Sequence, residues 1–149
     1  MSMKPTGAET MSGSQTILVV DDDAILRTLL RGSLQESGYA VLEAERGEDA
    51  LRVSKQHPGP IHLLIADVML PEKGALRLAR DSAGQSELNG IELARRVRAM
   101  RPDTRVMFIS GHTSDVIKRY GLPPETVFLM KPFAPDAVVR KVREILMSP

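Results

Sequence analysis

Short apolar runs alternate along the chain with longer segments in which apolar residues recur every three or four positions. Five runs have the length and the branched, apolar composition of buried strands: residues 16–20, 39–44, 61–66, 105–109 and 126–130. Five segments have the spacing of helices with one apolar face: residues 24–37, 47–56, 91–100, 114–120 and 135–146. This alternation predicts an α/β fold in which helices cover both faces of a parallel sheet.

Two stretches do not follow this pattern. Residues 1–15 are rich in Ser, Thr, Gly and Met without periodicity, and we expect a disordered tail there. Residues 72–88 have weak periodicity and loop composition, so we interpret them as an insertion after the third strand. The rest, residues 16–149, is expected to form one domain.

Composition narrows the classes of function. The 149 residues suffice for one domain with a buried core. The 20 Lys and Arg residues nearly balance the 19 Asp and Glu residues, so the net charge gives no reason to expect nucleic acid or an anionic membrane as a partner. The absence of cysteine excludes disulfides, thiolate catalysis and cysteine-bound zinc. Neither a membrane-spanning stretch nor a signal peptide is present, so we expect a cytoplasmic location.

Polar residues follow several of the predicted strands. Asp21 and Asp22 come after the first strand, Asp67 after the third, Ser110 after the fourth and Lys131 after the fifth. In open α/β sheets ligands bind at the carboxyl ends of the strands, so these side chains are expected to form one site. Clustered carboxylates repel one another unless a cation lies between them, and Mg²⁺, or Mn²⁺ in its place, prefers such oxygen ligands.

A carboxylate can also attack phosphorus and form an aspartyl phosphate. Lys131 could then offset the charge of the phosphoryl group, and Ser110 could donate a hydrogen bond to it. Each residue alone has a structural interpretation, such as a helix N-cap for the aspartates that end at Asp23. Together, in this order and in these contexts, they favour a site for phosphoryl transfer.

Five motifs stand at the ends of the predicted strands or open the third helix: Ile17 to Asp23, Asp67 to Pro71, Asn89 to Leu93, Phe108 to Gly111 and Lys131 to Phe133. On these motifs the chain resembles the receiver domains of bacterial two-component response regulators. The resemblance implies a flavodoxin-like (βα)5 three-layer sandwich with strand order 2-1-3-4-5. The stretches around Ser110 and Lys131 are similar to those of receivers attached to hybrid histidine kinases.

The resemblance also implies the role of each residue at the site. Asp67 would accept a phosphoryl group from a histidine kinase or a histidine phosphotransfer protein. Asp21, Asp22, Asp67 and the backbone carbonyl of Met69 would hold the metal. Lys131 would pair with the phosphoryl group, and the peptide bond from Lys131 to Pro132 is expected to be cis. We expect self-phosphorylation and autodephosphorylation that depend on Mg²⁺ rather than the activity of a usual enzyme.

Three further residues have implied roles in signalling. Ser110 and Phe128 would form the switch that responds to phosphorylation, and the side chains of Met69 and His112 would influence the rate of dephosphorylation. The surface of the fourth helix, fifth strand and fifth helix would bind a downstream protein or a second copy of the chain. For His112, an exposed loop residue without such a role stays an equal alternative.

Two other functions stay open. The chain could be a constitutive interaction module that keeps the receiver fold but does not depend on phosphorylation, for which the insertion at residues 72–88 is the one argument. It could also be a flavodoxin-like binder of a small molecule, although the three aspartates from Asp21 to Asp23 stand where a phosphate-binding loop would be needed. We expect no output domain after the last helix, and the sequence does not decide between a free-standing receiver and part of a larger chain.

Overall fold

The computed structural model describes residues 14–69, 89–111 and 113–147, and only the backbone of residues 113–115. The strands are β1 (Thr16–Val20), β2 (Ala40–Ala44), β3 (Leu63–Asp67), β4 (Arg105–Ser110) and β5 (Phe128–Met130). The helices are α1 (Ala24–Glu36), α2 (Gly47–Gln56), α4 (Gly90–Met100), α5 (Thr113–Tyr120) and α6 (Pro135–Met147). These elements confirm the predicted alternation of strands and helices.

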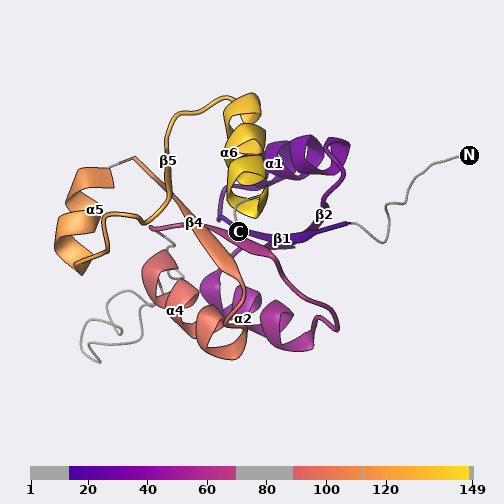
Figure 1. The fold of residues 1–149 in the computed structure, drawn as a ribbon, viewed down its shortest axis with the longest axis horizontal. Helices are drawn as coiled ribbons and strands as arrows, with labels where there is room; N and C mark the ends of the chain where they lie inside the picture. The colour runs from indigo at the N-terminus through magenta and orange to yellow at the C-terminus, as the bar shows by residue number, and fades with distance from the viewer. Residues whose placement is uncertain (1–13, 70–88, 112, 148–149) are drawn as a thin grey trace, which may run out of the picture.

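The strands form one parallel sheet of order β2-β1-β3-β4-β5, as the resemblance implied. Helices α1 and α6 cover one face of this sheet, and α2 and α4 cover the other (Figure 1). In the register Val20 pairs with Ala66, and Asp67 pairs with Ile109. The carboxyl ends of β1, β3 and β4 therefore lie beside one another at one edge.

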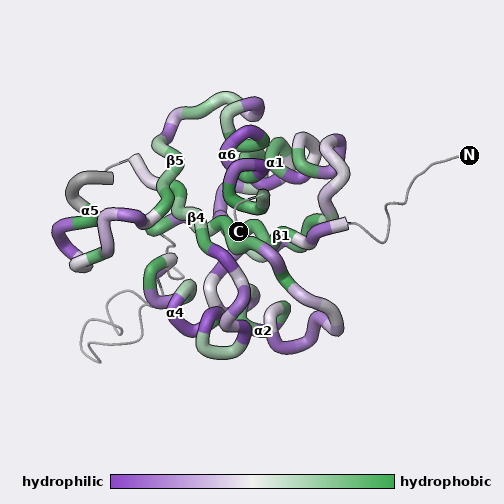
Figure 2. Tube along the Cα trace, in the orientation of Figure 1, coloured by the Kyte–Doolittle hydropathy of each residue, from purple (hydrophilic) through white to green (hydrophobic). Residues whose placement is uncertain are grey.

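Side chains of β1 show why the strands are apolar at every position. Leu18 and Val20 pack into the core beneath α2 and α4, whereas Ile17 and Val19 pack into the core beneath α1 and α6. A strand covered on both faces has no solvent-facing position, so its sequence is a continuous apolar run. The hydrophobic colouring accordingly follows the central strands, and hydrophilic residues lie on the outer parts of the helices (Figure 2).

The ends of α1 follow the local chemistry of the sequence. The side chain of Asp23 accepts hydrogen bonds from the backbone N–H groups of Ile25 and Leu26, at 3.0 and 3.2 Å, and so caps the first turn. Gly38 has a φ of 96°, a conformation that favours glycine and ends the helix as predicted. Only part of the apolar periodicity of α1 is buried, because Leu30 and Leu34 lie in the core while Ile25 is 74% and Leu29 51% exposed.

The observed boundaries differ from the predicted ones mainly in β3 and β5. Ile61 is buried but precedes β3, and its carbonyl accepts a hydrogen bond from the Thr104 hydroxyl at 2.7 Å. Thr126 precedes β5 because its N–H donates to the carbonyl of Pro123 in a turn. Within the described part of the chain, no helix is long and apolar enough to cross a membrane. The predicted insertion at 72–88, and nearly all of the predicted tail at 1–15, lie outside the described residues.

Candidate functional site

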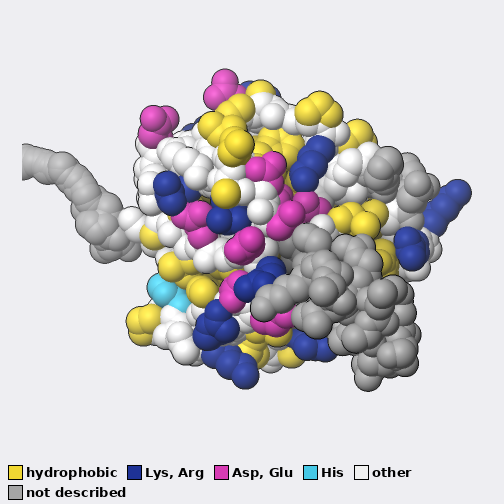
Figure 3. Space-filling view, turned by 180° about the vertical axis from the view of Figure 1, so that it is seen from behind, with side chains coloured by type: hydrophobic (Ala, Val, Ile, Leu, Met, Phe, Trp, Pro, Cys, Tyr) yellow, Lys and Arg dark blue, Asp and Glu magenta, His cyan; other side chains and the backbone are white. Residues whose placement is uncertain are grey.

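The three carboxylates that the sequence placed at strand ends meet in the structure. Asp21 and Asp22 directly follow β1, and Asp67 is the last residue of β3. One carboxylate oxygen from each lies within 4.8 Å of the others. Two of these residues, Asp21 and Asp67, are buried, and Asp22 is exposed. Seen from behind, acidic and basic side chains alternate across the middle of the molecule (Figure 3).

Lys131 lies against this cluster, one residue after β5. Its Nζ donates a hydrogen bond to Oδ2 of Asp67 at 2.7 Å and lies 3.8 Å from Oδ2 of Asp21. Its backbone N–H donates to the carbonyl of Ser110 at 2.9 Å, and its peptide bond to Pro132 is cis, as the resemblance implied. The other oxygen of Asp67, Oδ1, accepts a hydrogen bond from the N–H of Met69 at 2.8 Å. Both oxygens of Asp67 are thus held by donors from different segments.

The charges of this cluster perturb one another. Burial raises the pKa of Asp21 to about 6, and the negative charges of Asp67 and Asp22 act in the same direction. The N–H of Asp23 and the ammonium group of Lys131 oppose this rise. Partial burial acts to lower the pKa of Lys131, but the hydrogen bond and the charge of Asp67 outweigh it, so this pKa lies above its ordinary value.

Asp21 provides the test of whether a metal fits here. Its side chain is fully buried, and while Oδ1 accepts a hydrogen bond from the N–H of Asp23 at 2.9 Å, Oδ2 accepts none from the described residues. The ammonium group of Lys131 lies 3.8 Å from this oxygen, beyond hydrogen-bond distance. A buried carboxylate oxygen without a donor is costly unless a cation binds it directly. With the carboxylates of Asp22 and Asp67 nearby, this donor set fits a hard divalent cation such as Mg²⁺.

The first turn of α4 lies directly against the backbone of Asp67. The N–H of Gly90 donates to the carbonyl of Val68 at 2.9 Å, and a Cβ on Gly90 would lie 2.3 Å from the carbonyl oxygen of Asp67. In the sequence, Asn89 and Gly90 only begin one of the motifs that carry the resemblance. The structure adds that glycine is needed because two backbones approach closely.

Arg27 and Glu43 are neighbours of the site that sequence reasoning missed. Nη1 of Arg27 donates to the backbone carbonyl of Asp21 at 2.7 Å, and its Nε pairs with Glu43 at 3.3 Å. In the sequence Arg27 is one of many charged residues on a helix, and no spacing relates it to Glu43. One feature of the sequence could have drawn attention to this pair: Glu43 is a charged residue within the otherwise apolar strand β2.

The other residues predicted from the sequence are those of the switch and of dephosphorylation, and none of them belongs to the cluster of three carboxylates. Ser110 is buried at the end of β4, opposite Met130 in the register. Phe128 is partly buried, and its ring packs on that of Phe108 with the ring centres 5.7 Å apart. The side chain of Met69 is 66% exposed. The prediction for His112 lies outside the described residues.

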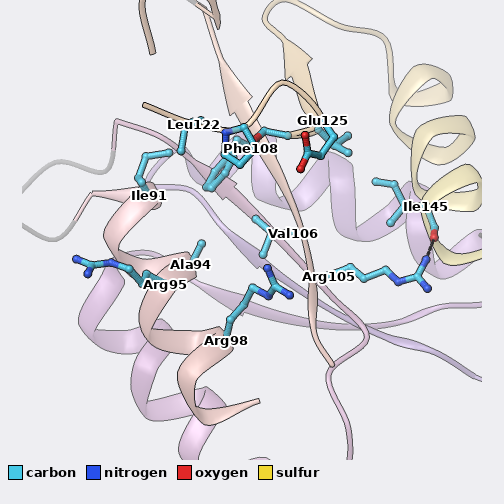
Figure 4. A pocket seen from close by; sticks show the side chains of 13 residues that line it. Ile91, Ala94, Arg95, Arg98, Arg105, Val106, Phe108, Leu122, Glu125 and Ile145 are labelled. Carbon is cyan, nitrogen blue, oxygen red and sulfur yellow. Dashed lines mark hydrogen bonds between the residues drawn. The ribbon is translucent and has the colours of Figure 1, made fainter. Parts of the chain in front are cut away.

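A separate hollow of about 580 Å³ lies between α4, β4 and the segment that precedes β5. Apolar side chains such as Val106, Phe108 and Leu122 line it, with Arg98 and Glu125 also facing this region (Figure 4). None of the clustered aspartates lines this hollow. The candidate chemistry therefore belongs to the edge of the sheet rather than to this hollow.

Comparison with known proteins gives a family. The family model described as "Response regulator receiver domain" matches residues 17–143. The chain is 32% identical over 141 residues to "Sensor kinase CckA" of Brucella abortus, a match that covers 93% of this chain and 13% of that protein. It is 29% identical over 133 residues to "Response regulator receiver protein CpdR" of the same organism, covering 89% of this chain and 97% of that protein.

A solved structure agrees with these matches. The crystal structure of the receiver domain from the hybrid histidine kinase CckA is similar with a TM-score of 0.67 and 30% identity, covering 89% of this chain and 99% of the other. The chain spans about half the length of several transcriptional regulators that it also matches, such as CssR of Bacillus subtilis at 52%. With the parallel sheet of order 2-1-3-4-5 and the acidic cluster beside Lys131, these matches show that the chain belongs to the family of response regulator receiver domains.

Proposed function

We propose that this chain is a phosphorylation-dependent signalling switch, in which Asp67 accepts a phosphoryl group from a phosphohistidine of a kinase or a phosphotransfer protein. One observation carries the proposal. Lys131 contacts Asp67 at 2.7 Å in a cluster where a buried oxygen of Asp21 has no hydrogen-bond donor among the described residues. A fixed cation beside a carboxylate, with a place for a second cation, is what transfer to a carboxylate requires.

The chemistry assigns a task to each group. A carboxylate oxygen of Asp67 attacks phosphorus, a new P–O bond forms, and the bond from phosphorus to the donor's leaving group breaks. Lys131 holds the Asp67 carboxylate and offsets the charge that arrives with the phosphoryl oxygens. Asp21 and Asp22, with Asp67 and the backbone carbonyl of Met69, would hold Mg²⁺, which offsets the remaining negative charge when bound.

A signal also needs a readout, and we assign it to Ser110 and Phe128. Ser110 is buried at the end of β4, and its carbonyl accepts a hydrogen bond from the N–H of Lys131. A movement of Lys131 on phosphorylation would therefore also displace Ser110. Phe128 packs on Phe108 in the same pair of strands.

Receiver domains act together with histidine kinases. The exposed side chains of Ile25 and Leu29, near Asp23, offer an apolar surface beside the site to which a protein donor can bind.

The direct test is intact-mass analysis after incubation with acetyl phosphate, with and without Mg²⁺. We expect one phosphoryl adduct that needs Mg²⁺ and is absent in Asp67→Asn. The matched control is Asp103→Asn, which makes the same change at an exposed turn and should leave the adduct intact. An adduct that persists in Asp67→Asn would assign the phosphoryl group to another residue.

A different result would favour the alternative function. If the wild type binds Mg²⁺ but forms no adduct, the chain is better explained as an interaction module that does not depend on phosphorylation. The cytoplasmic location, the downstream target and self-association through α5, β5 and α6 stay predictions.

A further inference from the structure

Arg27 is a charged residue of α1 that reaches back to the loop carrying the acidic residues. Its Nη1 donates to the carbonyl oxygen of Asp21 at 2.7 Å, while its Nε lies 3.3 Å from Oε1 of Glu43. The side chain of Arg27 is 18% exposed and that of Glu43 is 26% exposed. The planar guanidinium group presents several donors in a fixed geometry, so it can hold both acceptors at once.

These contacts hold the backbone of Asp21 from both sides. The N–H of Asp21 donates to the carbonyl of Ala44, at the end of β2, at 3.2 Å. Glu43, the preceding residue of β2, holds Arg27, and Arg27 holds the carbonyl of Asp21. Both peptide groups of Asp21 are thus fixed to one strand end, which sets the direction of its buried carboxylate.

We infer that Arg27, fixed by Glu43, is a positioning residue for the divalent cation site. It contacts none of the three clustered carboxylates itself, and it acts through the backbone of Asp21. Because the donor-free oxygen of Asp21 must point toward Asp22 and Asp67 to share a cation with them, a shift of its backbone weakens the site. This inference rests on the proposed function, since it concerns the affinity of the same site.

Two other arginines supply controls. Arg31 also pairs with Glu43 but has a side chain that is 41% exposed, and no contact joins it to Asp21. Arg101, which follows α4, donates to the carbonyls of Ser54, His57 and Gly59 at 2.9, 2.7 and 2.7 Å. Its removal therefore deletes the same kind of arginine-to-carbonyl bond at a place away from the cluster.

The experiment is isothermal titration of Mg²⁺ into the purified full chain, without a phosphodonor. We expect Arg27→Ala to raise the Kd for Mg²⁺ by about 10- to 100-fold, the usual effect of removing a group that orients a metal ligand. Arg31→Ala and Arg101→Ala should keep a Kd close to that of the wild type. Unfolding in urea without metal, measured on the same samples, shows how much stability each variant loses.

A double-variant cycle separates positioning from general damage. If Glu43 acts through Arg27, Glu43→Gln raises the Kd in the same direction, and Arg27→Ala with Glu43→Gln binds no more weakly than Arg27→Ala alone. Arg27→Lys should recover part of the affinity, since its ammonium group can still reach one of the two acceptors.

Three outcomes would overturn the inference. An unchanged Kd in Arg27→Ala would do so whatever the loss of stability, and so would an equal rise of Kd in the Arg27 and Arg101 variants, which would indicate a general structural effect. A wild type that binds no Mg²⁺ would instead contradict the proposed function itself, and the inference with it.

Discussion

A methyl group at position 90 should damage both the fold and the phosphoryl acceptor. The Cβ of Gly90→Ala would lie 2.3 Å from the carbonyl oxygen of Asp67 and 2.9 Å from its carbonyl carbon, whereas ordinary contacts begin at 3.4 Å. The atoms in the way are backbone, so no side chain can turn aside. The first turn of α4 must move by about 1 Å, and its hydrogen bond from Gly90 to Val68 must lengthen.

The size of the effect follows from this crowding. Overpacking of this kind costs about 1–3 kcal/mol, and it exceeds the gain of roughly 1 kcal/mol or less that alanine brings to a helix. Because the displaced backbone carries Asp67, the initial rate of adduct formation with acetyl phosphate should also fall, by about tenfold to a hundredfold. Urea unfolding measures the first quantity, and intact-mass analysis over time measures the second.

Gly32→Ala is the matched control. Gly32 is an exposed residue inside α1, and a Cβ there would meet no atom within 4 Å. The same substitution should therefore stabilise the protein by about 0.5–1 kcal/mol and leave phosphorylation unchanged. If Gly90→Ala is as stable as Gly32→Ala and accepts phosphoryl at the wild-type rate, the close approach of α4 to Asp67 is wrong.

Three further predictions concern single side chains. Burial raises the pKa of Asp21 in the folded, metal-free protein to about 6, above its ordinary 3.8. Asp21 should therefore contribute a loss of stability, on the order of 2–3 kcal/mol, as the pH rises from 4 to 6. Urea unfolding at each pH should show this loss as a difference between the wild type and Asp21→Asn. Asp23→Ala removes the cap of α1 and should cost about 1 kcal/mol, and an unchanged unfolding midpoint would contradict that role. Arg101→Ala leaves three backbone carbonyls without their donor and should cost about 2–4 kcal/mol by thermal or urea unfolding, and a loss below that of Asp23→Ala would refute it.

The sequence predicted the sheet and the location of the site for a reason of geometry. Apolar periodicity is a local property, so the strands and helices could be placed to within about two residues of those observed. In a parallel sheet all carboxyl ends lie at the same edge, so Asp21, Asp67 and Lys131 could be brought together before any contact was known. The resemblance added the strand order and the cis bond before Pro132, and both are present.

Other features depend on contacts between residues that are far apart in the chain. Leu29 and Leu30 belong to the same apolar periodicity, yet only Leu30 is covered, because α6 packs on one side of α1 alone. The pairing of Arg27 with Glu43 likewise joins a helix to a strand with no spacing rule between them.

The electrostatics and the tight packing at the site also depend on contacts between residues that are far apart in the chain. A sequence shows that Asp21 is acidic, but only its burial beside Asp67 determines that its pKa rises and that one oxygen lacks a donor. It shows a glycine at position 90, but only the approach of α4 to the backbone of Asp67 explains why a side chain would not fit. The sequence by itself thus determined which groups at the strand ends meet, because parallel strands end at one edge. Tertiary packing decided how closely those groups approach, how deeply they are buried and which residues from other elements, such as Arg27, hold them.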